Sequence, residues 1–147
     1  MKPSINDLLE TFFYSNGVLI RRTTGNRGYI RPDGYVYVRF MGRAYGEHRL
    51  IHLIFSGEWP YQVDHVNGIR NDNQPSNLRS ATHSQNCMNR KSITGKKGCY
   101  WNPRRQKWMV QVGLNGRRKT VGYFDDLNSA LKARAEMAKL LHGEFAR

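Results

Sequence analysis

Cysteine is nearly absent from this sequence, which contains Cys87 and Cys99 among 147 residues. The two do not form a Cys-x-x-Cys pair, so we expect neither a cysteine-rich zinc site nor a disulfide framework. The chain also lacks a signal-peptide pattern and any apolar run as long as a membrane span. These absences predict a soluble protein of the cytoplasm that does not bind membranes.

Acidic residues are scarce as well. The sequence has 11 Asp and Glu against 24 Lys and Arg, a formal net charge of +13, and 11 of the basic residues lie between Asn73 and Phe124, where no acid occurs. A phosphate polymer is the simplest partner for such a surface, because each neutralised phosphate releases condensed counterions. Composition therefore predicts nucleic-acid binding and leaves a ribosomal or other generic basic protein as the alternative.

The first 90 residues mix strand and helix patterns. β-branched and aromatic runs predict strands, while apolar residues at spacings of three and four predict helices. Asn67-Gly68 is a turn signal, and Thr82 is a candidate helix N-cap. The expected elements are strands at 17–21 and 34–40, a helix at 47–55 ended by Gly57, a strand at 63–66, a returning strand at 78–81 and a helix at 83–90.

A polar, basic and glycine-containing segment at 91–97 predicts a linker, so we divide the chain into domains at 1–92 and 96–147. Beyond the linker, Trp108, Val110 and Val112 alternate onto one face. The pattern predicts a three-stranded antiparallel sheet packed on one helix. Its expected elements are strands at 99–101, 107–112 and 119–124, a hairpin turn at 114–116, and a helix at 127–141 capped by Asp125 or Asp126 and ended by Gly143.

Asp64 and His65 stand side by side at the end of a predicted strand. Phosphodiester hydrolysis needs an activated water, and a histidine with a near-neutral pKa can activate it. It also needs neutralised phosphate charge and a stabilised leaving oxygen, which a divalent cation on oxygen ligands supplies. An isolated Asp-His pair is usually structural, so its weight depends on the spacing to Asn77 and Asn86.

In this spaced pattern, residues 45–90 resemble the HNH nuclease family, specifically its phage homing-endonuclease branch. The resemblance implies a ββα-metal (His-Me finger) module in which His65 is the general base and Asn77 fixes the loop and orients His65. It implies that Asp64 and Asn86 ligate one ion, Mg²⁺ or alternatively Mn²⁺. Many members have histidine where Asn86 stands, and a neutral oxygen ligand suits these ions better than zinc, which we do not expect.

Other polar residues near this pattern have weaker claims. His83 is expected to contact phosphate rather than a metal. His48 and His52 are four residues apart, as a metal pair would be, but their apolar surroundings favour structural hydrogen bonding. Asp72 and Asn73 are interpreted first as loop formers, with a supporting role for Asp72 near the metal as the alternative.

Residues 96–143 resemble the plant ethylene-response-factor (APETALA-type) DNA-binding domain, through Gly98-Cys99-Tyr100, Lys107-Trp108 to Val112, and Val121 to Asp125. That family places its sheet in the major groove of DNA. Several arginines of the plant first strand are replaced here by Tyr100 and Asn102, so the target sequence does not carry over. The alternative for each charged residue is contact with the DNA backbone alone. The expected DNA contacts are Arg79, His83, Arg90, Lys96, Lys97, Tyr100, Asn102, Arg104, Arg105, Lys107, Gln111, Arg117, Arg118 and Thr120.

These patterns together predict an α+β protein that cleaves double-stranded DNA at a preferred site, as a homing endonuclease or a nickase, in the host cytoplasm if the chain is phage-encoded. We expect a monomer, with a dimer as the alternative. A DNA-binding regulator with an inactive nuclease fold is the main rival, and a non-specific or structure-specific nuclease is the second.

Overall fold

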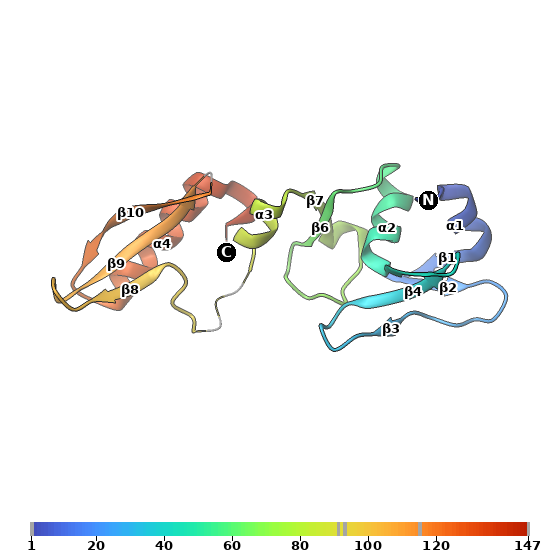
Figure 1. The fold of residues 1–147 in the computed structure, drawn as a ribbon, viewed down its shortest axis with the longest axis horizontal. Helices are drawn as coiled ribbons and strands as arrows, with labels where there is room; N and C mark the ends of the chain where they lie inside the picture. The colour runs from blue at the N-terminus through green and yellow to red at the C-terminus, as the bar shows by residue number, and fades with distance from the viewer. Residues whose placement is uncertain (1, 91, 93, 115, 147) are drawn as a thin grey trace. The chain divides into compact units, whose positions relative to one another are not determined.

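The computed structural model describes residues 2–90, 92, 94–114 and 116–146. Their contacts divide the chain into two compact units, Met1–Thr82 and His83–Arg147 (Figure 1). The expected division at 92–96 assigned the helix after Thr82 to the first domain, whereas these contacts group it with the second unit. The expected linker falls partly outside the described residues, because 91 and 93 are not among them.

Small antiparallel sheets and two helices build the first unit. The hairpin β1–β2, the sheet β3–β4–β5 and the hairpin β6–β7 are separate. The elements are α1 (Ile5–Thr11), β1 (Phe12–Ser15), β2 (Val18–Arg21), β3 (Tyr29–Ile30), β4 (Val36–Phe40), β5 (Arg43–Gly46), α2 (Glu47–Ser56), β6 (Gln62–His65), the 3-10 helix η1 (Pro75–Asn77) and β7 (Leu78–Ala81).

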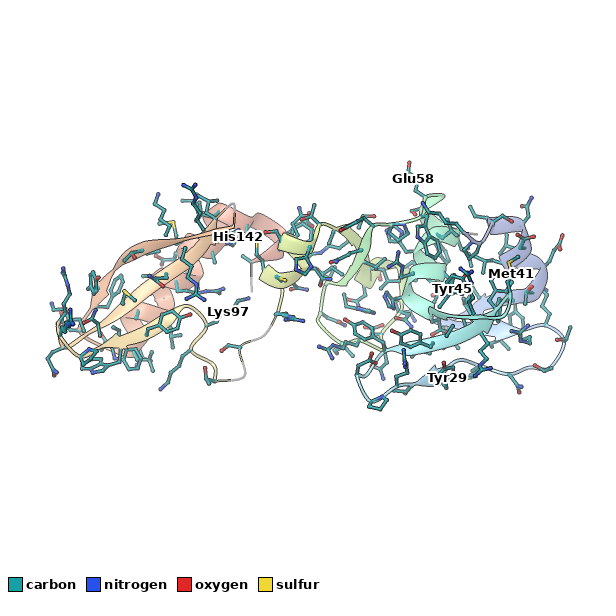
Figure 2. All side chains as sticks on the ribbon, viewed as in Figure 1. Tyr29, Met41, Tyr45, Glu58, Lys97 and His142 are labelled. Atoms are coloured by element: carbon teal, nitrogen blue, oxygen red, sulfur yellow. The ribbon has the colours of Figure 1, made fainter. Side chains whose placement is uncertain are left out.

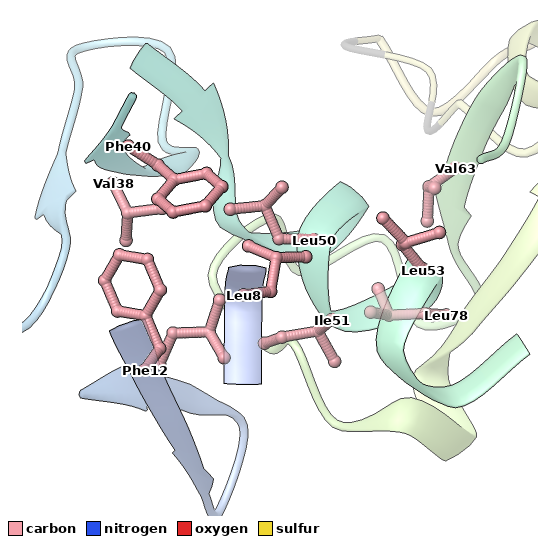
Figure 3. Close-up of a cluster of buried hydrophobic side chains, with 10 residues drawn as sticks. Leu8, Phe12, Val38, Phe40, Leu50, Ile51, Leu53, Val63 and Leu78 are labelled. Atoms are coloured by element: carbon pink, nitrogen blue, oxygen red, sulfur yellow. The ribbon is translucent and has the colours of Figure 1, made fainter. Parts of the chain in front are cut away.

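Helix α2 lies at the centre of the hydrophobic core of this unit. Its Leu50 and Ile51 are fully buried, and each such side chain contributes roughly 1.5–3 kcal/mol of burial free energy. Figure 3 shows these residues with the rest of the cluster, which comes from α1, β1, β2, β4, β6 and β7. The helix ends at Gly57, whose φ of 79° favours glycine. The predicted helix at 47–55 is therefore confirmed.

The second unit is a sheet with a helix across one face. It contains α3 (His83–Met88), β8 (Cys99–Asn102), β9 (Lys107–Leu114), β10 (Arg117–Phe124), α4 (Leu127–His142) and the 3-10 helix η2 (Gly143–Phe145). The strand order β10–β9–β8 is antiparallel throughout. The predicted sheet and helix are confirmed. The predicted turn at 114–116 falls partly outside the described residues, since 115 is not among them.

The core of the second unit is smaller than that of the first. Val110 from β9 and Ala130 from α4 are fully buried, and Trp108 and Val121 pack against them, as strand alternation predicts. The Asp126 carboxylate caps α4 by accepting a hydrogen bond from the Ser129 N–H at 2.9 Å. In the part of the chain that the structure describes, the helices are too short or too polar to cross a membrane.

Candidate active site

The β6–β7 hairpin holds the predicted catalytic pair. Asp64 lies opposite Arg79 in the register of this hairpin, and His65 lies opposite Leu78. Asp64 and His65 are each only 4% exposed. Ionisable side chains are rarely buried unless hydrogen bonds or opposite charges compensate for the lost hydration. Two such residues in succession therefore mark the end of β6 as a candidate site.

Asn77 fixes the loop between these strands. Its side-chain amide donates to the carbonyl oxygen of Asp72 at 2.7 Å and to Asn67 Oδ1 at 3.0 Å, and its Oδ1 accepts from the Asn67 N–H at 2.9 Å. Asn67 in turn donates to the Asp72 carboxylate at 2.6 Å. These bonds are the ones a loop-fixing asparagine would make, in line with the first part of the role expected for Asn77.

The Asn73 side chain is hydrogen-bonded to the imidazole of His65. The distance between Asn73 Oδ1 and His65 Nε2 is 3.0 Å. Asn73 is 2% exposed, which is unusual for a loop asparagine. The sequence interpretation assigned orientation of His65 to Asn77 and treated Asn73 as a loop former, so this contact is a residue role that the sequence pattern missed.

Glu47 lies behind Asn73 and is almost completely buried, at 1% exposure. Its Oε2 accepts from the Asn73 amide at 2.8 Å, and its Oε1 accepts from the backbone N–H of Leu19 at 2.8 Å. Burial raises the pKa of Glu47, while the two hydrogen bonds and the charge of Arg27 lower it. The Glu47 carboxylate at the start of α2 thus connects strand β2 to Asn73 in the candidate site.

Aromatic rings surround the imidazole of His65. The rings of Tyr35 and His48 lie 5.8 Å and 5.2 Å from it, centroid to centroid, and the Arg70 guanidinium stacks on Tyr35 at 5.1 Å. Burial, followed by the charges of His65 and Arg49, lowers the pKa of His48 to about 3. Within the described residues His48 Nδ1 has no hydrogen-bond partner. His48 is therefore a packed neutral ring rather than the hydrogen-bonded residue expected.

His52 behaves as the sequence predicted. Its two ring nitrogens lie 3.0 Å and 3.1 Å from the hydroxyls of Ser56 and Ser80. Both ring nitrogens therefore have structural partners, as the expected structural hydrogen bonding requires.

Burial also lowers the pKa of His65 below its ordinary value of 6.5. The hydrogen bond with Asn73 and the charges of Asp64 and Asp72 oppose this shift without cancelling it. A lowered pKa keeps the imidazole neutral at physiological pH, and only the neutral form can accept a proton. The direction of this pKa shift thus favours the form of His65 that the predicted general base requires.

Asp64 is paired with Arg79. Its Oδ2 accepts from Arg79 Nε at 2.9 Å and from Nη2 at 2.8 Å. Arg79 neutralises this buried carboxylate, and its expected contact with DNA stays a prediction. A carboxylate oxygen is still the kind of ligand that Mg²⁺ prefers, and Mg²⁺ needs few protein ligands because it retains waters. Among the described residues no group of three or more His, Cys, Asp and Glu side chains lies together as a metal cluster would.

The remaining predicted ligand, Asn86, lies in α3 of the second unit. Its approach to Asp64 therefore stays a prediction, as does a phosphate contact by His83 in the same helix.

Six of the predicted DNA contacts lie on the face of the β8–β9–β10 sheet that does not pack on α4. Gln111 pairs with Thr120 in register and donates to its hydroxyl at 3.3 Å, while Tyr100, Arg118 and Thr120 are exposed. Arg104, Arg105 and Arg117 are exposed at the strand ends. This surface, called the outer sheet face below, comprises Tyr100, Asn102, Lys107, Gln111, Arg118 and Thr120.

Several of these residues also have structural contacts. Asn102 Oδ1 accepts from the Arg105 N–H at 3.0 Å in the β8–β9 turn, and Lys107 pairs with Asp125 at 3.0 Å. Lys97, labelled in Figure 2, donates to the carbonyl oxygens of Met88 and Arg90. Lys97 and Asn102 thus stabilise local backbone, whatever else they contact.

Residues 45–88 match the sequence model of the HNH endonuclease family. This HNH segment contains Glu47, Asp64, His65, Asn73 and Asn77, so the buried site lies within the matched stretch. A DNA nuclease is the activity that the match indicates. The chain matches no curated protein and no solved structure.

The HNH segment ends before the sheet of the second unit. It also begins after the β1–β2 hairpin, so the backbone donor at Leu19 lies outside it. The resemblance of residues 96–143 to the plant DNA-binding domain therefore stays a prediction.

Proposed function

We propose that this chain is a divalent-metal-dependent endonuclease that hydrolyses phosphodiester bonds in double-stranded DNA. The observation that carries the proposal is the buried Asp64–His65 pair, which lies inside the HNH segment and has its imidazole held by Asn73. Burying a histidine beside a carboxylate lowers the stability of a core, so such a pair is typical of a functional site. A neutral imidazole held in one orientation can act as the base in hydrolysis of a phosphate ester.

In this proposal His65 is the general base. It accepts a proton from the water whose oxygen attacks phosphorus, and the bond from phosphorus to the leaving oxygen breaks. The products are a phosphate monoester and a hydroxyl, and the leaving oxygen ends with a proton taken from solvent. Asn77 contributes indirectly, because its bonds to Asn67 and Asp72 keep the loop that carries Asn73 in place.

Asp64 and Asn86 are the proposed ligands of Mg²⁺ or Mn²⁺. The bound ion would neutralise charge on the scissile phosphate and stabilise the leaving oxygen. Both ligands offer oxygen atoms, which favours these hard cations over zinc.

The outer sheet face is proposed to recognise DNA. Gln111 and Asn102 have the amide groups that pair with adenine edges, and the arginines can pair with guanine or with phosphate. This division of labour, with cleavage by residues of the HNH segment and recognition by the outer sheet face, suits a site-preferring enzyme of the homing-endonuclease kind. One active site per chain makes a nick the expected product of a monomer, and a dimer would cut both strands.

A DNA-binding protein without nuclease activity is the second candidate. The Asp64–Arg79 ion pair favours it, since Arg79 already neutralises the carboxylate that a metal would use. The two candidates differ in whether adding a divalent cation starts strand cleavage.

Cleavage of supercoiled plasmid tests the proposal. We expect Mg²⁺ to support conversion to the nicked form, chelation to stop it, and His65→Gln to abolish it while DNA binding in a mobility-shift assay is retained. His52→Gln is the matched control, because the ring nitrogens of that histidine bond to the hydroxyls of Ser56 and Ser80 and the change should leave cleavage intact. Equal cleavage by wild type and His65→Gln would sink the catalytic assignment, and DNA binding with no cleavage in any metal would support the second candidate.

A further inference from the structure

A continuous line of hydrogen bonds runs from β2 to the proposed general base. It passes from the Leu19 N–H to Glu47, from Glu47 to Asn73, and from Asn73 to His65 Nε2, with distances of 2.8, 2.8 and 3.0 Å. All three side chains are buried, with exposures of 1%, 2% and 4%. Water therefore has little access to exchange for any of these partners.

The first group in this line sets the direction of all the others. The Leu19 N–H can only donate and faces Oε1, and the amide nitrogen of Asn73 faces Oε2, so both Glu47 oxygens act as acceptors. Asn73 must then offer its amide N–H to Glu47, which leaves its carbonyl oxygen toward His65. That oxygen also can only accept, and a hydrogen bond with it requires a proton on His65 Nε2.

We infer that Glu47 and Asn73 are positioning residues that hold His65 as the Nε2–H tautomer and leave the lone pair on Nδ1. The inference deepens the proposed function, on which it rests, by naming the nitrogen that takes the proton from water. A neutral imidazole has one donor nitrogen and one acceptor nitrogen, so the opposite tautomer would present N–H where a base is needed.

The β1–β2 hairpin belongs to the candidate site because Leu19 in β2 is the first donor of this series of hydrogen bonds. Tyr14 donates to Gln74 Oε1 at 3.0 Å, one residue beyond Asn73. Gly17 approaches the same loop so closely that an added Cβ would lie 3.3 Å from Gln74 Nε2. The HNH segment alone lacks the backbone donor at Leu19, so we expect the full first unit to be needed for the correct tautomer.

Glu47→Gln tests the inference because it keeps the shape of the side chain and reverses one hydrogen bond. The Leu19 N–H still needs an acceptor, so the amide oxygen of the new glutamine turns to Leu19 and its NH₂ turns to Asn73. Asn73 must then rotate to accept, and its own NH₂ meets His65 Nε2, which has to become an acceptor. We expect His65 to switch to the Nδ1–H tautomer.

The double variant Glu47→Gln/Asn73→Asp should reverse this switch. An aspartate at position 73 accepts from the glutamine on one side and from His65 Nε2–H on the other, so the original tautomer returns. The double variant also restores the wild-type number of buried carboxylates in the line. A role of Glu47 in packing alone does not predict such a rescue.

The tautomer can be measured by ¹⁵N NMR of histidine-labelled full-length protein at about pH 8, where the imidazoles are neutral. The His65 signals are identified by their absence in His65→Gln. We expect Nε2–H in wild type, Nδ1–H in Glu47→Gln, and Nε2–H again in the double variant. Plasmid cleavage should follow the same order, with kcat reduced on the order of 10²-fold in Glu47→Gln, KM unchanged, and partial recovery in the double variant.

Glu58→Gln is the matched control, since that carboxylate is exposed beyond the end of α2 and should alter neither tautomer nor kcat. An Nδ1–H tautomer in wild type, or no change of tautomer in Glu47→Gln, overturns the inference. If Glu47→Gln does not fold by circular dichroism, the wild-type and double-variant tautomers decide the question. A correct set of tautomers in a protein that cleaves no DNA would refute the proposed function and leave the assignment of Glu47 and Asn73 intact.

Discussion

Residues 1–82 contain 10 Lys and Arg against 7 Asp and Glu, whereas residues 83–147 contain 14 against 4. The net charges are therefore +3 and +10. The first unit buries Glu47, His48, Asp64 and His65, while the second buries no ionisable side chain other than a cysteine among its described residues. The first unit therefore buries several ionisable side chains, whereas the second exposes many charged ones to water.

This contrast follows from what each kind of charge can do. A buried ionisable group has strong interactions and a shifted pKa, but it needs partners in defined positions. An exposed cation needs no partner to compensate for lost hydration, and salt screens its charge. Several such cations add their contributions to the free energy of DNA binding, and these contributions depend little on the exact position of each cation. Changes in the first unit should therefore act sharply on chemistry and stability, and changes in the second should act gradually on binding.

Removing the second sheet should give the largest effect. Deleting residues 96–147 should weaken DNA binding on the order of 10³-fold at low salt and flatten the dependence of log K on log salt, because several phosphate contacts are lost together. Mobility-shift titrations at several NaCl concentrations measure both quantities, and circular dichroism checks that the first unit remains folded. Equal affinity of the truncated protein for the same site would show that the outer sheet face does not recognise DNA.

Arg79→Met should show how strongly the first unit depends on compensating charge. Asp64 would be left buried without its arginine, and loss of one partner of a buried pair costs about 3–5 kcal/mol of unfolding free energy, less here because Arg79 is partly exposed. Urea unfolding measures this loss. If Asp64 binds metal, Mg²⁺ should stabilise the variant more than it stabilises wild type. Equal stability of the two proteins without metal would argue against a structural ion pair.

His48→Gln should change how stability depends on pH. His48 has a pKa of about 3 when folded and an ordinary value of 6.5 when unfolded, so between these values the unfolded chain binds a proton that the native protein does not. Stability from this group is fully present above pH 6.5 and is lost as pH falls, at about 1.4 kcal/mol per pH unit. Urea unfolding at pH 7.5, 6 and 5 should show a smaller slope for the variant. An unchanged slope would mean that His48 is protonated in the native state.

Single substitutions on the outer sheet face should have the smallest effects. Arg118→Gln removes one exposed cation, so we expect binding to weaken by about 1 kcal/mol or less and the salt slope to fall by about 1. Lys132→Gln on α4 is the matched control, because it removes a cation from the helix instead of the sheet. Equal losses in both variants would point to net charge rather than to a surface on the sheet.

Local patterns predicted much of this fold. The α2 helix, the β6–β7 hairpin and the sheet of the second unit follow from apolar spacing and strand alternation, and the cap at Asp126 follows from side-chain type. The sequence interpretation assigned no structure to α1, β1, β3 or β5. These are short elements, and β3 and β5 are largely exposed, so their residues show little hydrophobic periodicity.

Some residues of the candidate site could likewise be predicted from local sequence, and others could not. Residue type and spacing singled out Asp64 and His65, which the structure buries, and the hydrogen bonds of Asn77 hold the loop between β6 and β7, while the catalytic roles stay predictions. Glu47 was missed because an acidic residue in the first turn of a helix is ordinarily explained by the helix dipole. Nothing in its local sequence indicates that the side chain is buried.

The sequence by itself determined the excess of basic residues after Asn73, the Asp64–His65 pair and the alternation that builds the second sheet. Only the tertiary structure decided that Asn73, not Asn77, contacts His65, and that Arg79 faces Asp64. The physical reason is distance along the chain. Glu47 joins Leu19 and Asn73, which are 28 and 26 residues away, and no periodicity in a sequence encodes contacts between segments that separate elements bring together.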